Sequence, residues 1–397
     1  MKETFKEDTT EGGNLAYTGL ILISGEDAAG IAATVLETLS PFKIIIREIE
    51  QIVIRSRLLL TLLIQLNPAH GPAIESDLME CAEKLHVDIA ISFSEIGSEL
   101  NSGTRSLLTV QADQLIPEDL ARITNAIFQS GGNIESISRV ANSPYPVHHF
   151  QISGSFHEVL TQKLSHASSI SFIECALLPS DLYGARKLVV LDVDSTLIDQ
   201  EVIDLLAAKA GAQKQVAAIT ESTMRGELDF GQSLAARVLL LKGLPISALE
   251  KVRSEISLTP GAVELIATLQ ELGHPVALVT GGFSELVSPL ARELNIRHLR
   301  ANNLEIKDGY LTGMTQGPIV DRAAKAQALI DFAVLEKIPL SHTIAIGDGA
   351  NDLDMLKISG LGIAFMAKPI LIEAAAASIK TRDLARVLTL LGISRKD

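Results

Sequence analysis

The sequence predicts an α/β protein in which two small βαββαβ domains precede a doubly wound parallel sheet that carries a helical cap. Two observations predict the fold class. The order strand, helix, strand, strand, helix, strand occurs twice before Lys187, and apolar strands alternate with longer helices after it. The length of 397 residues fits two or three domains of about 100–200 residues each.

Composition narrows the class of protein. The 47% hydrophobic content is enough to fill a substantial core. The formal net charge is -14, and the sequence contains no run of Lys or Arg that would form a basic patch. We therefore expect no nucleic-acid partner, although a few focused cations and a metal can still bind an anionic substrate.

Cysteine content and hydropathy predict a cytoplasmic protein. The two cysteines, Cys81 and Cys175, show neither disulfide nor zinc spacing, which favours a reducing compartment. Residues 1–14 lack the apolar core of a signal peptide. The longest apolar runs, such as Leu58–Ile64, are too short to span a bilayer, so we expect no membrane partner.

The first small domain is predicted at residues 16–100, after a flexible tail at 1–15 that is rich in polar and charged residues. The predicted strands are Leu20–Ile23, Ile44–Ile54, Arg57–Gln65 and Val87–Ser92, and the predicted helices are Ile31–Leu39 and Ile74–Lys84.

The second small domain, residues 101–180, repeats this order after a linker at Asn101–Gly103. Pro117 suits a first helical turn, and Gly131 and Gly132 suit the end of that helix. The predicted strands are Leu107–Val110, Ile134–Val140, Val147–Ser153 and Ile170–Ala176, and the predicted helices are Pro117–Gln129 and Phe156–Leu164.

The third domain, residues 185–397, reads as a parallel sheet with helices on both faces. Its predicted strands are Leu188–Asp192, Val276–Thr280, Thr343–Gly347 and Leu361–Phe365. A helical cap is inserted at about 200–258, where Asp229 and Gln232 form a predicted capping box. Asp308-Gly309, within Leu304–Leu311, predicts a hairpin turn.

Polar clusters follow the predicted strands, at the edge where open parallel sheets bind their ligands. They are Asp192 with Asp194, Thr280-Gly281-Gly282, Asp348 to Asp352, and Lys325. Each motif alone is more often a helix cap, a turn or a solvated lysine. Together, in this order, they predict phosphoryl transfer, which needs a nucleophile, a metal site, oxygen-binding donors and an acid.

The residue types assign roles in this chemistry. Asp192 suits a nucleophile that is also a metal ligand, and Asp194 lies where a bend can turn it towards the leaving group. Asp348 adds a second carboxylate for a hard cation, best matched by Mg²⁺. Three further groups can bind the phosphate oxygens. Thr280 offers a hydroxyl, Gly281 lets its backbone N–H approach the phosphate closely, and Lys325 supplies a positive charge.

Residues 187–391 resemble the haloacid dehalogenase (HAD) superfamily, with its Rossmannoid fold, and within it the phosphoserine phosphatase family. The stretches that carry the resemblance are Asp192–Thr196, Val279–Phe283, Ala324–Ala326 and Gly347–Asp352. The resemblance implies Mg²⁺ bound by Asp192, Asp348 and the backbone carbonyl of Asp194, and Asp194 as general acid and then base. It also implies a substrate contact for Asn351 and supporting places for Asp352 and Gly282.

The cap segment resembles that of the same family. Glu201, Met224, Phe230 and Arg237 are thereby assigned to the substrate. A carboxylate for an ammonium group, an arginine fork for a carboxylate, and apolar groups that exclude water suit a zwitterion. The alternatives stay open that Met224 and Phe230 fill the cap core, and that Arg237 pairs with an acid such as Glu227.

The two small domains resemble ACT domains, which bind amino acids and pair between subunits. The first copy keeps Gly25, Asp27 and Gly30 in the effector loop, whereas the second copy reads Gln111–Pro117 there and lacks the glycines. A ligand site and a purely structural role are both open for the second copy. We expect a homodimer through the exposed edges of these sheets.

The resemblance implies hydrolysis of O-phospho-L-serine to L-serine and phosphate through an aspartyl-phosphate, the last step of serine biosynthesis, with possible feedback by serine at the ACT domains. Two alternatives stay open. One is a phosphatase or phosphomutase acting on another small phosphorylated metabolite. The other is an amino-acid-sensing protein with an inert phosphatase domain.

Overall fold

A computed structural model describes residues 16–96, 105–141, 144–154, 157–179, 181–182, 184–224 and 227–393. The predicted tail at 1–15 and the predicted linker Asn101–Gly103 lie outside these ranges. The chain divides into two compact units, residues 1–102 and 103–397. The second small sheet therefore shares one unit with the large sheet.

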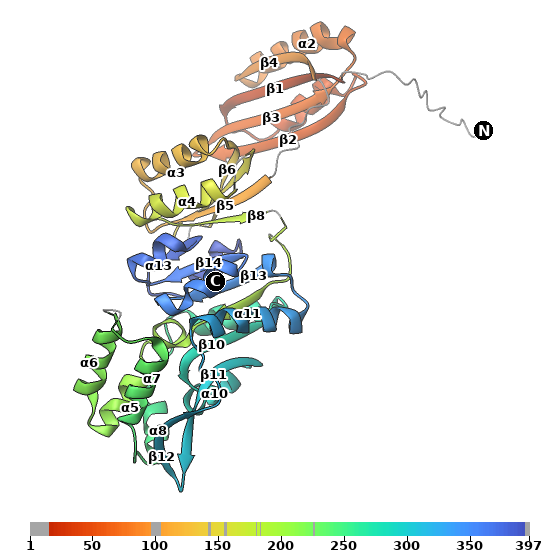
Figure 1. Ribbon diagram of the computed structural model, residues 1–397. Coiled ribbons are helices and arrows are strands. Elements are labelled where there is room, and N and C mark those ends of the chain that lie inside the picture. Colours follow the sequence, from red (N-terminus) through yellow and green to blue (C-terminus); the bar gives the residue numbers. More distant parts are fainter. Residues whose placement is uncertain are drawn as a thin grey trace. The chain divides into compact units, whose positions relative to one another are not determined.

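The first unit is one βαββαβ domain, as predicted (Figure 1). Its strands lie in the order β2-β3-β1-β4, and all neighbours are antiparallel. Alternate residues such as Ile21 and Ile23 are buried against the helices, as a half-covered sheet requires. Its elements are β1 (Ala16–Glu26), α1 (Ile31–Leu39), β2 (Ile45–Ile54), β3 (Arg57–Gln65), α2 (Gly71–Leu85) and β4 (Val87–Ile96).

The predicted effector loop of the first unit starts later than the sequence indicated. Gly25 lies inside strand β1 opposite Val87, where an added Cβ would come within 2.6 Å of the Val87 Cγ1 atom. Asp27 follows the strand, and its backbone N–H donates to the Ser56 carbonyl oxygen over 2.8 Å. Gly30 has a φ of 96°, a left-handed conformation that favours glycine, and it is the N-cap of helix α1.

The small sheet of the second unit repeats the topology with the order β6-β7-β5-β8. The last strand was predicted wrongly: helix α4 runs on to Ser169, a turn follows, and the strand begins only at Glu174. Phe156, the predicted start of α4, lies outside the described residues. The elements are β5 (Arg105–Gln111), α3 (Pro117–Gln129), β6 (Asn133–Ala141), β7 (Val147–Ser153), α4 (His157–Ser169) and β8 (Glu174–Pro179).

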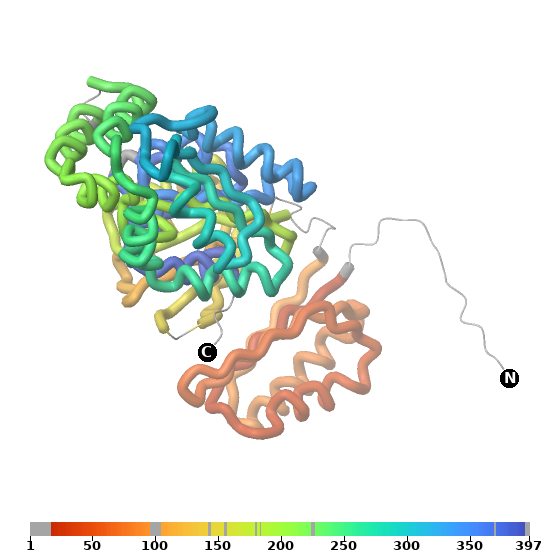
Figure 2. The backbone as a smooth tube through the Cα atoms, turned by 90° about the horizontal axis from the view of Figure 1, so that it is seen from below, coloured from red at the N-terminus to blue at the C-terminus, as the bar shows by residue number. Residues whose placement is uncertain are grey.

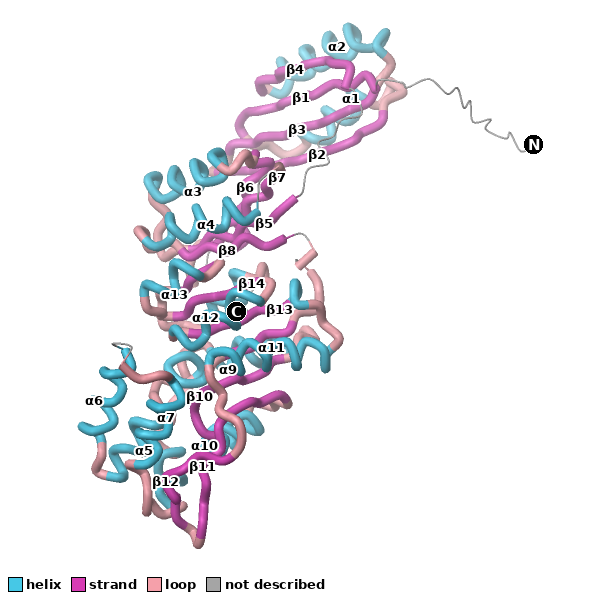
Figure 3. Tube along the Cα trace, viewed as in Figure 1, coloured by secondary structure: helices cyan, strands magenta, loops and turns pink. Residues whose placement is uncertain are grey.

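The large sheet has the strand order β12-β11-β10-β9-β13-β14-β15, and every pair except β11 with β12 is parallel (Figure 3). Val189 and Leu191 pack on the face with α9, α10 and α14, and Leu188 and Val190 on the face with α11 and α12. The strands are β9 (Leu188–Leu191), β10 (Val276–Phe283), β11 (His298–Lys307), β12 (Tyr310–Gln316), β13 (Thr343–Gly347), β14 (Leu361–Phe365) and β15 (Ala377–Ile379). The helices are α9 (Ala262–Glu271), α10 (Ser284–Glu293), α11 (Arg322–Glu336), α12 (Leu353–Ile358), α13 (Pro369–Ala374) and α14 (Arg386–Leu390).

The cap is a group of four helices that lie together beside the large sheet (Figure 2). They are α5 (Val202–Ala210), α6 (Gln213–Met224), α7 (Phe230–Leu239) and α8 (Ser247–Arg253). The predicted capping box is present: the Gln232 N–H donates to Asp229 Oδ1 over 2.8 Å, and the Asp229 N–H donates to Gln232 Oε1 over 3.2 Å. Two linkers, residues 198–201 and 257–259, join the cap to the sheet, and Ile198 pairs with Leu258 in an antiparallel bridge.

The hairpin of β11 and β12 turns at Asp308 and Gly309, as predicted. Both residues have positive φ, 51° and 82°, which matches the two-residue turn that fits the twist of paired strands. Within the described ranges, no helix combines the length and the apolarity needed to cross a membrane.

Candidate active site

A sharp turn places two carboxylates at the end of strand β9. Asp192 follows the strand, and its N–H donates to the Ile346 carbonyl oxygen on β13 over 2.9 Å. The turn Val193–Leu197 then departs from helical geometry at Asp194, and Ser195 has a φ of 56°. A positive φ in a non-glycine residue is strained and typical of functional sites. The chain thus turns directly after the strand, and Asp194 lines the same cavity as Asp192.

Lys325, on helix α11, joins two of the predicted acids. Its Nζ lies 2.7 Å from Asp192 Oδ1 and 2.7 Å from Asp352 Oδ1, and its side chain is 1% exposed. Burial alone would lower the pKa of Lys325, but the Asp192 and Asp352 carboxylates outweigh it and raise that pKa. The ammonium group is therefore permanently charged and fixed beside Asp192.

Three carboxylates meet at this point. Oxygens of Asp192, Asp348 and Asp352 lie within 4.8 Å of one another. Burial raises the pKa of Asp348 to about 6, and burial together with Asp352 raises that of Asp192 well above its ordinary range. Such crowding is unfavourable unless a cation shares the site, and a cluster of carboxylate oxygens fits a divalent metal. Both oxygens of Asp352 already accept hydrogen bonds, Oδ1 from Lys325 and Oδ2 from the Gly349 N–H at 3.1 Å, whereas Asp192 contacts Lys325 through Oδ1. Asp192 and Asp348 are therefore the better ligands.

Asp194 is held by hydrogen bonds on both oxygens. Oδ1 accepts from the Val202 N–H over 2.9 Å, and Oδ2 accepts from the Thr280 hydroxyl over 3.1 Å. Thr280 in turn accepts from the Gly282 N–H over 2.8 Å. Burial, followed by the charge of Glu201, raises the pKa of Asp194 to about 7. An acid with this pKa carries a transferable proton near neutrality.

Two glycines make room for this arrangement. A Cβ on Gly282 would lie 2.7 Å from Asp194 Oδ2, and one on Gly281 would lie 3.1 Å from the Phe230 Cζ atom. The first distance is too short for any side chain, so Gly282 is required beside the predicted acid. Gly281 lets the cap residue Phe230 close onto the strand end.

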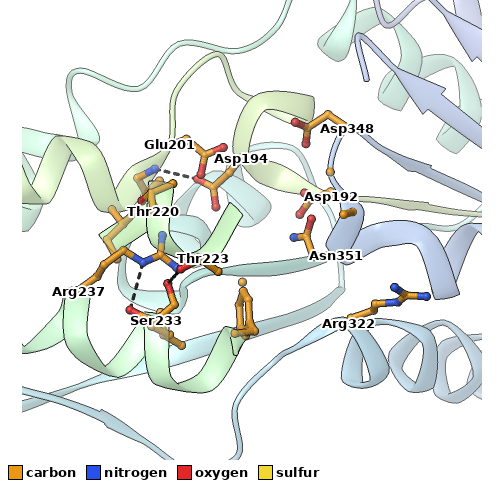
Figure 4. A pocket seen from close by; sticks show the side chains of 18 of the residues that line it. Asp192, Asp194, Glu201, Thr220, Thr223, Ser233, Arg237, Arg322, Asp348 and Asn351 are labelled. Atoms are coloured by element: carbon orange, nitrogen blue, oxygen red, sulfur yellow. Dashed lines mark hydrogen bonds between the residues drawn. The ribbon is translucent and has the colours of Figure 1, made fainter. Parts of the chain in front are cut away.

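A cavity of about 450 Å³ lies between the sheet and the cap (Figure 4). Asp192, Asp194, Asp348 and Asn351 approach it from the sheet, the first linker contributes Glu201, and the cap contributes Phe230 and Arg237. Lys325 and Thr280 are almost completely buried and act on the lining residues from behind. The side chain of Met224, the last residue of α6, lies outside the described part of the chain.

Glu201 and Arg237 bring opposite charges to the cap side of the cavity. The Ser195 hydroxyl donates to Glu201 Oε1 over 2.9 Å, and Arg237 Nε donates to the Ser233 carbonyl oxygen over 3.3 Å. Burial outweighs the nearby Glu201 charge and lowers the pKa of Arg237 from its ordinary value. Both side chains thus line one cavity: Glu201 lies beside Asp194, and Arg237 lies across the cavity from Asp192 and Asp348 (Figure 4).

Comparison with known proteins agrees with this geometry. Residues 189–357 match the haloacid dehalogenase-like hydrolase family, and residues 18–92 match the ACT domain. A phosphoserine phosphatase of Streptomyces coelicolor is 45% identical over 386 residues, which cover 96% of this chain and 93% of that protein. Phosphoserine phosphatase SerB2 of Mycobacterium tuberculosis is 40% identical, with 95% and 93% covered. The chain belongs to the phosphoserine phosphatase family of HAD hydrolases.

Solved structures support this membership. The structure of a phospho-aspartyl intermediate analogue of phosphoserine phosphatase covers 53% of this chain and 99% of its own, with 45% identity and a TM-score of 0.50. A HAD family hydrolase from Salmonella enterica serovar Typhi covers 72% and 98%, with 28% identity and a TM-score of 0.63.

Several lining residues of the cavity were not predicted from the sequence. Those with polar or charged side chains are Thr220, Thr223, Ser233, Arg322 and Lys368. One signal was available, because Arg322 precedes Lys325 by three residues and so shares its side of helix α11. Thr223 donates to the Ser233 hydroxyl over 2.6 Å, and Ser233 also binds Arg237, so this pair positions a predicted residue.

Proposed function

We propose that this chain hydrolyses O-phospho-L-serine to L-serine and phosphate through a phospho-aspartate on Asp192. One observation carries the proposal: a single cavity brings Asp192 together with Glu201 and Arg237 (Figure 4). Glu201 suits the ammonium group of serine, and Arg237 suits its carboxylate. The names of the relatives point to the same substrate.

The reaction proceeds in two displacements at phosphorus. A carboxylate oxygen of Asp192 forms a bond to phosphorus while the bond to the serine oxygen breaks. Asp194 gives its proton to that leaving oxygen. Asp194, now ionised, removes a proton from a water molecule, whose oxygen attacks phosphorus and displaces Asp192. The products are serine, phosphate and the original enzyme.

The residues around Asp194 suit both of its roles. The Val202 N–H and the Thr280 hydroxyl fix its carboxyl group, and burial with Glu201 sets its pKa to about 7. A pKa near the working pH makes both the protonated and the ionised form accessible in one cycle. In this proposal the main role of the Thr280 hydroxyl is its hydrogen bond to Asp194, and its predicted contact with the phosphate is the lesser role.

We assign the metal as Mg²⁺, held by Asp192, Asp348 and the backbone carbonyl of Asp194. The observation behind this choice is the set of hard carboxylate oxygens from Asp192, Asp348 and Asp352. When bound, Mg²⁺ supplies positive charge that screens the phosphate from the attacking carboxylate. Lys325 supplies further charge, and Gly281 and Asn351 donate to phosphate oxygens.

Phe230 and Met224 complete the proposed substrate site as groups that exclude water. Phe230 lines the cavity above Gly281. Water exclusion strengthens the interactions of Glu201 and Arg237 with the substrate, because charges attract more strongly in a medium of low dielectric constant.

The test is a substrate profile of the full-length protein with Mg²⁺. We expect hydrolysis of phosphoserine to exceed that of a sugar phosphate by at least about tenfold, because a sugar phosphate leaves Glu201 and Arg237 unpaired. Asp192→Asn should remove several orders of magnitude of activity. The control is Asp331→Asn, since Asp331 is a partly exposed acid that pairs with Arg300. Full activity in Asp192→Asn, or an equal rate on the sugar phosphate, contradicts the proposal.

We also propose serine as the effector of the first ACT domain, at Asp27 and Gly30 in the loop after β1, because Gly25 lies inside the strand. The support is the match of residues 18–92 to the ACT domain and the exposed turn after β1. Calorimetry of the full-length protein with L-serine tests this. Asp27→Asn should remove one class of binding, whereas Glu201→Gln should remove the product-like binding at the active site. If Glu201→Gln removes all the heat of serine binding and Asp27→Asn removes none, the effector site is rejected.

A homodimer through strand β2 completes the proposal. Among the described strands, β2 pairs only with β3, and all ten of its residues are exposed. An exposed edge strand offers unpaired backbone groups to a second copy. Ile45, Ile52 and Ile54 add apolar surface to that edge, being 57%, 51% and 61% exposed.

A further inference from the structure

The segment Lys380–Arg386, called the connector below, runs from the end of strand β15 to the first residue of helix α14 and contacts the small sheet of β5–β8 through Glu174. Glu174 begins strand β8 and is 1% exposed. Its Oε1 accepts from the backbone N–H groups of Lys380 at 2.9 Å and Thr381 at 3.2 Å, and its Oε2 accepts from Arg386 Nη1 at 2.9 Å. A buried carboxylate with this many donors fixes the donors firmly, because any loss leaves a buried charge unpaired.

Arg386 is the second anchor of the connector on the small sheet. Its guanidinium lies 3.9 Å above the centre of the Tyr145 ring, and its other arm pairs with Asp113. Gln111, which is completely buried, donates to Glu174 over 2.9 Å. Gln111 ends strand β5, and Asp113 belongs to the loop after it, which corresponds to the predicted effector loop of the first unit.

The same connector contacts both linkers of the cap. Arg382 donates to Asp199 Oδ1 from Nε at 3.0 Å and from Nη2 at 2.6 Å. Asp199, in the first linker, accepts from the Ser257 hydroxyl at 3.0 Å, and its N–H donates to the Ser257 carbonyl oxygen at 3.0 Å. The Leu384 N–H donates to the carbonyl oxygen of Pro260, directly after the second linker, at 2.8 Å.

The linkers decide how the two halves of the active site meet. Asp192 lies on the sheet, whereas Glu201 and Arg237 belong to the cap side of the cavity. Asp199 precedes Glu201 by two residues, so a displacement of the first linker displaces Glu201 directly. Although burial opposes it, hydrogen bonds from Arg382 and Ser257 lower the pKa of Asp199, so its charge persists at neutral pH.

We propose that the connector couples the second ACT-like sheet to the hinge of the cap, with Glu174 and Arg382 as positioning residues for the substrate groups Glu201 and Arg237. Movement of β8 displaces the amides of Lys380 and Thr381, and Arg382 passes this displacement to Asp199. The coupling concerns the proposed active site and in that respect rests on the proposed function. Its structural part holds for the protein without substrate.

Hydrogen exchange of the full-length protein without ligand tests the coupling. Arg382→Gln should accelerate exchange in peptides spanning 193–201 and 255–262 by roughly twofold to fivefold, the size expected for an exposed ion pair. Glu174→Gln should accelerate exchange at 378–384 by roughly tenfold and should also accelerate the two linker peptides. The matched control is Arg300→Gln, because the Arg300–Asp331 pair is 40% and 37% exposed and the Arg382–Asp199 pair is 43% and 32% exposed.

Unchanged linker exchange in Glu174→Gln overturns the coupling, even if exchange at 378–384 rises. Equal acceleration of the linkers in Arg300→Gln also overturns it. If Glu174→Gln does not fold, Asp113→Asn replaces it, since Asp113 pairs with Arg386 and its side chain is 77% exposed. Loosened linkers in Asp113→Asn support the proposal, and unchanged linkers contradict it.

Kinetics provide a second readout. Arg382→Gln should lower kcat/KM for phosphoserine by roughly twofold to tenfold, mainly by raising KM, because the misplaced groups bind the substrate and the reacting groups stay on the sheet. Arg382→Lys should restore part of the loss. A fall confined to kcat contradicts the positioning role. Absence of phosphoserine hydrolysis in the unmodified protein rejects the proposed function but leaves the exchange result intact.

Discussion

The two βαββαβ domains share one topology but differ in the sheet face that their own helices leave open. In the first copy this face carries Leu20, Leu22 and Leu59, which are 39%, 46% and 51% exposed. In the second copy the equivalent face of β5 carries Thr109 and Gln111, which are both fully buried. The two copies of the fold therefore use this face differently. The first copy exposes an apolar face, whereas the second copy packs against the C-terminal segment of its own chain.

The difference extends to the loop after the first strand. In the first copy that loop is exposed and contains Gly30 in a left-handed conformation. In the second copy it carries Asp113, which pairs with Arg386 on helix α14. Two alternatives were left open for the second loop, a ligand site and a structural role. The ion pair of Asp113 with Arg386 supports the structural role.

Removal of Arg386 should produce the largest effect and should be specific to the second copy. Arg386→Met leaves the buried carboxylate of Glu174 without its charge partner, at an expected cost of about 3–5 kcal/mol of unfolding free energy. Urea unfolding of the full-length protein measures it. Leu22→Thr, on the open face of the first copy, serves as the control and should change stability by about 0.5 kcal/mol or less. Equal losses of unfolding free energy in Arg386→Met and Leu22→Thr would show that the two faces contribute alike to stability.

Gly25 provides an intermediate effect that is confined to the first copy. Its Cβ would approach the Val87 side chain within 2.6 Å, whereas the second copy accommodates Ala112 at the equivalent position. Gly25→Ala should therefore destabilise the first domain by about 1–3 kcal/mol through overpacking. Thermal unfolding followed by calorimetry should show a shift in one transition. A stability gain would mean that Val87 moves aside freely.

The edge strand of the first copy should decide self-association. Ile52→Lys introduces charge on strand β2 and should raise the dimer dissociation constant by about tenfold, or about 1.4 kcal/mol. Its matched control is Ile137→Lys on β6, the equivalent edge strand of the second copy, where Ile137 is 53% exposed. Light scattering across a concentration series measures both. Dissociation in the control alone would assign the interface to the second copy.

Much of this architecture was predictable because local patterns encode it. Alternating apolar residues predicted the strands of both small domains except the last strand of the second, and Asp308-Gly309 predicted the turn of the hairpin. Parallel strands bring their carboxyl ends to one edge of a sheet. The positions of Asp192 and Asp348 directly after two such strands therefore predicted that they lie close together. These predictions rest on interactions between near neighbours in sequence or on a general rule of topology.

Other features depend on contacts that no local pattern encodes. Glu174 and Arg386 are 212 residues apart, and neither lies in a motif that signals the other. The last strand of the second copy was placed too early, because Ile170 and Phe172 look like strand residues yet lie exposed in the turn after α4. The bond from Thr280 to Asp194 depends on the strained turn at Ser195, which the sequence does not reveal.

The most direct test of the central claim is to trap the covalent intermediate on Asp192. The full-length protein is mixed with phosphoserine and Mg²⁺, quenched in acid and treated with borohydride, which reduces an acyl phosphate to an alcohol. Peptide mass spectrometry should find the reduced side chain at residue 192, and its yield should fall in Asp194→Asn because the first displacement then lacks its acid. Turnover without reduction at residue 192, or reduction at Asp348 instead, would contradict the assignment of the nucleophile.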